Sequence, residues 1–354
     1  MKGFLATVQP QRRAAALFAC ISRFPKNETG RRQDRSLTFD LVSEPVLFLG
    51  ETLVDLICER RLESWSQADS FVPHCGGAPT NAAIVCARCG AEVALAGGAG
   101  DDHWGRWLEE RLRAEKIDLR WWKRLPGVQT GVAFDVIDLQ GVPDFLIYGQ
   151  GIEPALEALE PKLEEAMTSC AALELGSNTL VGEHERAVSE RARALALAAG
   201  KPLIIDVNLR LHRWESPAQA VNTVHSLCAG ALLVKVNREE AQLLSGESDP
   251  ARGAEAICAD LGARVVVVTL GADGALMRGE TQANARGLAA NVVDTTGAGD
   301  ALLGVLVAAL AGSGFDLAAA AEALSIAVKI AARSTERYGA LDALPISISL
   351  TGIP

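Results

Sequence analysis

The sequence predicts an α/β fold in which a doubly wound, mostly parallel sheet is flanked by helices and carries a small β lid. Short apolar runs alternate with helical patterns through most of the chain, as repeated βα units require. Glycine turns and polar residues follow several of these runs, and ligands bind at that end of a parallel sheet. One stretch, 130–148, instead alternates polar and apolar residues around a Gln-Gly turn, which indicates a β-hairpin. A hairpin inserted into a βαβ pattern predicts a flap that excludes water from a site.

Composition limits the classes of function. The 354 residues suffice for one large or two small domains, and 49% hydrophobic content provides a substantial core. A net charge of −10 without a long basic block argues against nucleic acid as a partner. No apolar run reaches the roughly 18 residues that a membrane span needs, so no membrane partner is expected. Eight scattered cysteines without a disulfide-framework spacing fit a reducing, cytoplasmic location. We interpret Cys86 and Cys89 as packed helix cysteines, not as a metal pair.

The first 44 residues differ from the rest of the chain. Arg12 and Arg13 precede a short apolar run at 14–21, which has the order of a targeting peptide but lacks a clear cleavage site. The alternative is an N-terminal extension that is disordered or follows from a start codon assigned too early. We favour the extension, so the sequence divides into residues 1–44 and a single domain over 45–354.

The first half of the domain supplies one acid, two glycines and an amide that suit a polar ligand. After a buried strand at 46–50, Asp55 lies among apolar neighbours, either as a surface residue or as a substrate ligand. Gly76 and Gly77 let a ligand approach the backbone closely. Asn81 falls in the first turn of the next helix, where its amide can bond two sugar hydroxyls or serve as an ordinary cap. A strand within 90–100 and a helix over 106–115 follow.

The second half repeats the βα pattern. Apolar periodicity predicts helices over 160–171, 183–199, 254–261, 300–311 and 317–333, and strands over 203–207, 232–236, 265–270 and a run ending at 291–293.

The stretch 294–300 holds the strongest chemical signal. It reads as a strand, a glycine turn and a helix start, so the backbone N–H groups from Gly297 to Asp300 can point at one spot. Such a nest binds an anion, typically a phosphoryl group, and Asp300 is placed to act as the base that takes a proton from an attacking hydroxyl. The plain alternative is a helix capped by Thr295 or Asp294.

With these motifs in place, the chain resembles the ribokinase-like (pfkB) carbohydrate kinase family over residues 45–345. The resemblance rests on four stretches: 76–81 with 100–105, the run 294–301, an Asn-x-x-Glu pattern at 237–240, and a turn at 269–274. The absence of a G-x-G-x-x-G after the first strand disfavours a dinucleotide-binding dehydrogenase.

The resemblance implies a role for each matching residue. Asp300 would be the catalytic base, and Gly297, Ala298 and Gly299 would form the anion hole. The sugar would contact Asp55, Gly76, Gly77 and Asn81. ATP would lie along Thr269, Gly271 and Gly274, with Asn237 and Glu240 organising the Mg²⁺-nucleotide, the glutamate through water. A monovalent cation, K⁺ as a rule, would bind near Asp294, Thr296 and Gly339. The lid would comprise strands at about 56–75 and 120–150, and a homodimer could form through it.

The substrate implied is a small sugar phosphorylated on a primary hydroxyl, with fructose ahead of 2-keto-3-deoxygluconate. Tyr148 is followed by Gly149-Gln150 where an arginine would suit a carboxylate, which weakens the case for ketodeoxygluconate. Arg210 could replace that arginine or could be a structural partner of Asp206. The sequence also leaves open a nucleoside kinase of the same family and a non-catalytic sugar- or nucleotide-binding protein on this fold.

Overall fold

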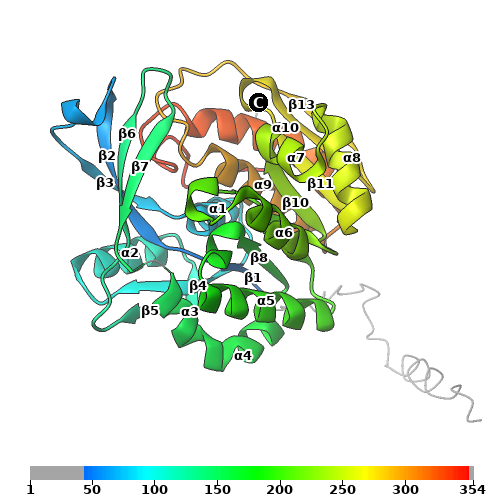
Figure 1. The fold of residues 1–354 in the computed structure, drawn as a ribbon, viewed down its shortest axis with the longest axis horizontal. Coiled ribbons are helices and arrows are strands. Elements are labelled where there is room, and N and C mark those ends of the chain that lie inside the picture. Colours follow the sequence, from blue (N-terminus) through cyan, green and yellow to red (C-terminus); the bar gives the residue numbers. More distant parts are fainter. Residues whose placement is uncertain (1–43, 151, 351–354) are drawn as a thin grey trace, which may run out of the picture. The chain divides into compact units, whose positions relative to one another are not determined.

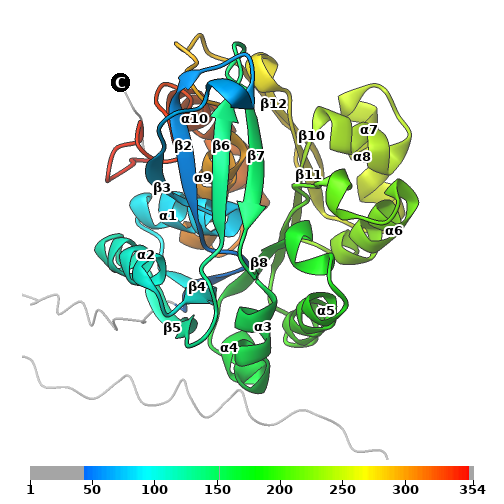
Figure 2. The ribbon, with the colours of Figure 1, turned by 60° about the vertical axis from the view of Figure 1, so that its left-hand side comes forward.

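Two sheets and the helices around the larger one make up the part of the chain that the structure describes. The computed structural model describes residues 44–150 and 152–350, so the prediction for residues 1–43 lies outside it. Figure 1 shows the large sheet running through the layers of helices, and Figure 2 shows the smaller sheet upright on the left. In the described ranges, no helix is both long and apolar enough to cross a membrane.

The large sheet has nine strands in the order β13-β12-β11-β10-β9-β8-β1-β4-β5. All neighbours from β11 to β5 pair in parallel, and only the edge strands β12 and β13 are antiparallel. The strands are β1 (Val46–Leu49), β4 (Val93–Gly100), β5 (Asp118–Leu125), β8 (Ala172–Gly176), β9 (Leu203–Asp206), β10 (Leu233–Asn237), β11 (Val265–Thr269), β12 (Gly274–Gly279) and β13 (Ala283–Arg286). This arrangement confirms the predicted doubly wound α/β fold.

Helices cover both faces of this sheet because its central strands are apolar on both sides. Val46 and Phe48 of β1 pack under one layer of helices, and Leu47 and Leu49 pack under the other. The first layer contains α1 (Ala78–Arg88), α2 (His103–Ala114), α9 (Ala298–Gly312) and α10 (Leu317–Ser334). The second contains α3 (Glu153–Leu159), α4 (Leu163–Thr168), α5 (Glu183–Ala198), α6 (Pro217–Cys228), α7 (Arg238–Ser245) and α8 (Pro250–Leu261).

The smaller sheet has the order β3-β2-β6-β7. Its strands are β2 (Leu53–Arg61), β3 (Val72–Gly76), β6 (Val132–Ile137) and β7 (Pro143–Tyr148). β6 and β7 form the antiparallel hairpin that the alternating pattern predicts. β5 pairs with β4 in the large sheet, so the first part of the segment 120–150 lies outside this smaller sheet.

Two predicted elements are wrong. The run ending at 291–293 is not a strand, because the N–H groups of Val293 and Asp294 both donate to the carbonyl of Thr335, at 2.7 and 3.2 Å, and not to a neighbouring strand. The helix over 160–171 is shorter than predicted: a 3₁₀ turn at Glu160–Lys162, which contains a proline, separates α3 from α4.

Candidate active site

Several of the predicted site residues lie at the carboxyl ends of the parallel strands. Asn237 ends β10 and lies directly opposite Thr269 at the end of β11. Asp206 ends β9 and pairs in register with Lys235 of β10. The first turn of α9 carries Asp300 to the same edge of the sheet, within the electrostatic reach of Asp206 and Lys235. Ligands of open α/β sheets bind at this edge.

Gly297 makes the turn that begins α9. It adopts a left-handed conformation with φ 74° at the N-cap position. A Cβ built on it would lie 2.2 Å from Cβ of Ala340, so both the backbone and the available space require glycine. The N–H groups of the first turn of a helix have no partner within the helix. The N–H groups of Gly299 and Asp300 therefore point out of the helix start, where the helix dipole also favours an anion.

Asp300 is a buried carboxyl group held in place by a neighbouring helix. Its side chain is 9% exposed and accepts a hydrogen bond from Nδ2 of Asn81 at 3.0 Å. Burial and the charge of Asp206 raise the pKa of Asp300 to about 6, against the opposing effects of Lys235, Asn81 and Arg210. A carboxylate with a pKa near the working pH suits general base catalysis.

The cation beside Asp300 is a lysine that sequence reasoning missed. Lys235 Nζ donates to both carboxylate oxygens of Asp206, at 3.0 and 3.1 Å. The predicted structural alternative, an Arg210–Asp206 pair, is therefore wrong. The Arg210 guanidinium instead lies 5.6 Å from the ring centroid of Phe145 on β7. The available signal was a single lysine inside the apolar run 232–236.

Asp55, Gly76 and Gly77 lie together where β2 meets β3. Asp55 is 7% exposed, and a Cβ on Gly76 would lie 2.2 Å from its Oδ2. Gly77 has φ 103°, and a Cβ there would lie 2.3 Å from the carbonyl oxygen of Glu51. Burial, followed by the charge of Asp135, raises the pKa of Asp55 well above its usual range. Gly76 thus lets the buried carboxyl group of Asp55 lie against the backbone, and Gly77 lets the carbonyl of Glu51 do so.

Asp135 is a second buried carboxyl group of the smaller sheet that the sequence analysis did not single out. It is 3% exposed, and its Oδ1 has no hydrogen-bond partner. Burial and the charge of Asp294 raise the pKa of Asp135 to about 7. Together with Asp55 and Asp300 it makes the surroundings of the site acidic.

Asn237 and Glu240 form a reciprocal cap at the start of α7. Oδ1 of Asn237 accepts from the N–H of Glu240, and Oε2 of Glu240 accepts from the N–H of Asn237, both at 2.8 Å. Oε1 of Glu240 accepts from the N–H of Leu209 at 2.7 Å. Both carboxylate oxygens are thus held by backbone donors. Thr269, Gly271 and Gly274 follow on the adjacent strand and turn.

Asp294 joins the anion-hole turn to the loop at 339–340. Its side chain is fully buried, and Oδ1 accepts from the N–H and the hydroxyl of Thr296, at 2.8 and 2.6 Å. Oδ2 accepts from the N–H of Gly339 at 2.9 Å. The three residues predicted for a monovalent cation are therefore neighbours, although this carboxylate is committed to the loops themselves. Nowhere in the described residues do three or more His, Cys, Asp or Glu side chains gather as a metal site would require.

The tip of the β6–β7 hairpin contacts the segment that leads into the anion hole. The carbonyl of Gly141 accepts from both the N–H and the hydroxyl of Thr295, at 3.0 Å each. Arg61 of β2 donates to the carbonyls of Leu139 and Val292. The smaller sheet is thus attached to the loop that carries the helix start, a connection that sequence patterns do not reveal.

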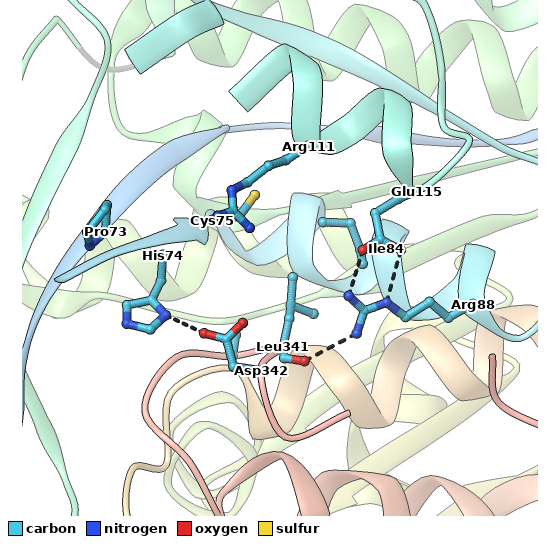
Figure 3. Close-up of a pocket in the computed structure, with 10 residues that line it drawn as sticks. Pro73, His74, Cys75, Ile84, Arg88, Arg111, Glu115, Leu341 and Asp342 are labelled. Atoms are coloured by element: carbon cyan, nitrogen blue, oxygen red, sulfur yellow. Dashed lines mark hydrogen bonds and ion pairs between the residues drawn. The ribbon is translucent and has the colours of Figure 1, made fainter. Parts of the chain in front are cut away.

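A cavity of about 80 Å³ is lined by residues of β3, α1 and α2 and by the loop at 340–342. Figure 3 shows His74 pointing to Asp342 across this cavity, with Arg88 paired to Glu115 beside them. Nδ1 of His74 lies 2.5 Å from Oδ2 of Asp342, and Nε2 lies 3.1 Å from Oε1 of Glu59. These contacts link β3 to the C-terminal loop, and the cavity contains none of the predicted site residues.

Comparison with known proteins gives a consistent assignment. The model of the pfkB family carbohydrate kinases matches residues 43–347. Fructokinase-1 of Oryza sativa subsp. japonica is 31% identical over 315 residues, which cover 87% of this chain and 97% of the rice protein.

Two solved structures extend the comparison. A fructokinase from Vibrio cholerae O395, bound to fructose, ADP and calcium ion, is 29% identical with a TM-score of 0.70, covering 85% of this chain and 96% of its own. Aminoimidazole riboside kinase from Salmonella enterica, complexed with aminoimidazole riboside and an ATP analog, is 26% identical with a TM-score of 0.69 over the same shares. The chain belongs to the pfkB family of carbohydrate kinases and is an ATP-dependent sugar kinase.

Proposed function

We propose that this kinase phosphorylates a primary hydroxyl of fructose, with Asp300 as the general base. The observation that carries the proposal is the position of Asp300. Its buried carboxyl group, fixed by Asn81 at 3.0 Å, lies at the start of α9 beside unpaired backbone donors of that helix. A sugar hydroxyl bound here would lie between this carboxylate, which can take its proton, and a phosphoryl group held by the N–H donors at the helix start.

The protein's contribution to the reaction is then positioning and charge. Asp300 accepts the proton of the sugar hydroxyl as that oxygen bonds to the γ-phosphorus, and the bond from phosphorus to ADP breaks. The N–H groups of Gly299 and Asp300 stabilise the negative charge on the phosphoryl oxygens. Asp55 and Asn81 orient the sugar, and Gly76 and Gly77 leave room for it. The smaller sheet acts as a lid that excludes water.

ATP is proposed to lie along Thr269, Gly271 and Gly274, next to Asn237. Both Glu240 oxygens already accept backbone hydrogen bonds, so Glu240 would reach Mg²⁺ only through water, and the ion would be held mainly by the nucleotide phosphates. Mg²⁺ neutralises charge on the phosphates when bound. The buried Asp294 carboxylate draws the 294–296 and 339–340 loops together, which supports a K⁺ site formed by their carbonyl groups.

The acidic surroundings of the site favour a neutral sugar. Asp55, Asp135 and Asp300 are all buried there, and burial raises the pKa of each. These raised pKa values show that the pocket disfavours negative charge, so a carboxylate substrate such as 2-keto-3-deoxygluconate would be unfavourable there unless Arg210 paired with it. The identity to fructokinases of about 30% supports fructose. The likeness to aminoimidazole riboside kinase makes a riboside the second candidate.

We also propose that the outer face of the smaller sheet is the surface through which a homodimer would form. Leu146 and Tyr148 of the edge strand β7 are 51% and 57% exposed, and uncovered apolar edges favour pairing. Sedimentation at several protein concentrations tests this, with Tyr148→Lys as the variant that should yield monomers. A cytoplasmic location is likewise proposed, supported by the seven free thiols in the described residues.

The substrate proposal is tested by ADP release from MgATP across fructose, ribose, 2-keto-3-deoxygluconate, aminoimidazole riboside and adenosine. Fructose is expected to give the highest kcat/KM. A higher value for a riboside would keep the proposed mechanism and discard fructose. Turnover with ketodeoxygluconate that is lost in Arg210→Met would show that Arg210 carries a carboxylate.

A further inference from the structure

A buried ion pair lies directly beneath the proposed anion hole. Lys235 and Asp206 face each other across β10 and β9, and their side chains are on the sheet face that α9 covers. They are 6% and 3% exposed, and Lys235 Nζ lies 3.0 and 3.1 Å from the two oxygens of Asp206. A Cβ built on Gly299 would lie 2.6 Å from Nζ and 3.2 Å from Cε of Lys235. The ammonium group is therefore packed against the backbone of the turn.

Stability alone does not explain such a pair. A buried ion pair loses the hydration of both charges, and an apolar pair of similar volume is often equally stable. The strand residues on either side of Lys235, from Leu233 to Val236, are apolar, so a hydrophobic residue would fit the sheet pattern. The pair therefore calls for a role that depends on its charge.

We propose that the Lys235–Asp206 pair is a positioning device for phosphoryl transfer. Lys235, held between Asp206 and the backbone of Gly299, fixes the first turn of α9 and supplies positive charge next to the base and the transferring phosphoryl group. Lys235 is then a positioning residue that acts through Gly299 and Asp300. This inference rests on the proposed role of Asp300 as the base.

The charges around Asp300 give the pair a measurable effect on the base. The carboxylates of Asp206, Glu174 and Asp55 face it from β9, β8 and β2, whereas Lys235 and Arg210 are the opposing cations. Burial and Asp206 raise the pKa of Asp300, and Lys235 lowers it. Removing the lysine or the aspartate should therefore move the pKa of the base in opposite directions.

The test compares the pH dependence of kcat/KM in the full-length enzyme and the variants Lys235→Met, Asp206→Asn and the double variant. The acid limb is the fall in kcat/KM at low pH, where the base becomes protonated. This limb should move to higher pH by about 1 unit in Lys235→Met and to lower pH in Asp206→Asn. In the double variant the limb should return near its original position, whereas kcat stays lower by on the order of tenfold or more, because the charge beneath Gly299 is gone. The melting temperature should fall in each single variant and recover in the double variant.

General damage to the fold would move the acid limb in the same direction in both single variants, or in neither, and either result would overturn the proposal. If Lys235→Met does not fold, Asp206→Asn and the double variant still decide it. Lys201→Met, which removes a Lys–Glu44 pair of 2.8 Å away from the site, is the matched control and should leave the profile unchanged. Asp300→Asn distinguishes failure of this inference from failure of the proposed base. If Asp300→Asn retains activity, the proposed base is refuted. If Asp300→Asn is inactive but the acid limbs of Lys235→Met and Asp206→Asn do not shift, only the role of Lys235 is refuted.

Discussion

Replacing Gly297 by alanine tests whether the turn that begins α9 depends on glycine. Two costs follow from the structure. The left-handed φ of 74° costs an L-residue about 1–2 kcal/mol. The new Cβ would lie 2.2 Å from Cβ and 2.8 Å from Cα of Ala340, and such overpacking costs about 1–3 kcal/mol more. We therefore expect Gly297→Ala to lower the free energy of unfolding by about 2–5 kcal/mol.

The same change should reduce turnover, because the turn can relieve the overlap only by moving the donors of the anion hole. Urea unfolding measures the first effect, and ADP release measures the second. Gly312→Ala is the matched control at the other end of α9, where a Cβ meets nothing within 4 Å. It should be neutral or slightly stabilising, since alanine is the better helix former.

A second variant separates the two costs. Gly297→Ala combined with Ala340→Gly removes the closest overlap and leaves the strained backbone conformation, so part of the lost stability should return. The reasoning would be refuted if Gly297→Ala unfolded at the same urea concentration as the parent protein and retained full turnover.

The remaining predictions concern charge and capping. Because burial raises the pKa of Asp300 to about 6, stability is lost as pH rises from the ordinary aspartate pKa to about 6, and the full loss is present at pH 7. Asp300→Asn should therefore increase the free energy of unfolding at pH 7 by up to about 3 kcal/mol, and a loss of stability in urea would contradict this. Although burial lowers the pKa of His74, the hydrogen bond to Asp342 raises it overall, so the contribution of this pair is present below the ordinary histidine pKa and is lost as pH rises. Asp342→Asn should therefore cost about 1 kcal/mol more at pH 6 than at pH 9 in chemical denaturation, and equal costs would argue against the ion pair. Asp102→Ala should cost about 2 kcal/mol, because its carboxylate caps α2 and also binds the segment leading into β6. Asp249→Ala removes only the cap of α8 and should cost about 1 kcal/mol. If Asp102→Ala and Asp249→Ala lowered the stability equally in thermal melts, the second role of Asp102 would be refuted.

Most of the fold could be predicted because the central strands are buried on both faces. Runs such as 265–269 contain only apolar and β-branched residues up to the strand end. Most of the other central strands, β4, β8, β9 and β10, are followed by a helical pattern before the next strand begins. The antiparallel edge strands β12 and β13 were missed. They are short, and the glycines at 274 and 279 together with the polar residues 280–282 between the two strands are typical of turns and not of strands.

The candidate site was predictable as local motifs but not as a set of contacts. The turn at 297–300 has its glycines and its acid within four consecutive positions. The partner of Asp206 depends instead on the register of β9 and β10, which places Lys235 opposite it and leaves Arg210 near Phe145. The hydrogen bond between Asp294 and Gly339 likewise joins residues far apart in the sequence. The roles assigned to the individual site residues stay predictions until variants are measured.

The most direct test of the account is the turnover of Asp300→Asn under saturating MgATP and fructose, with sugar and nucleotide binding measured on the same sample. Asparagine keeps the shape of the side chain and removes its capacity to accept a proton. We expect both ligands to bind with nearly unchanged affinity while kcat falls by about 10²–10⁴-fold. A variant that binds both ligands and retains the kcat of the parent protein would show that Asp300 is not the base.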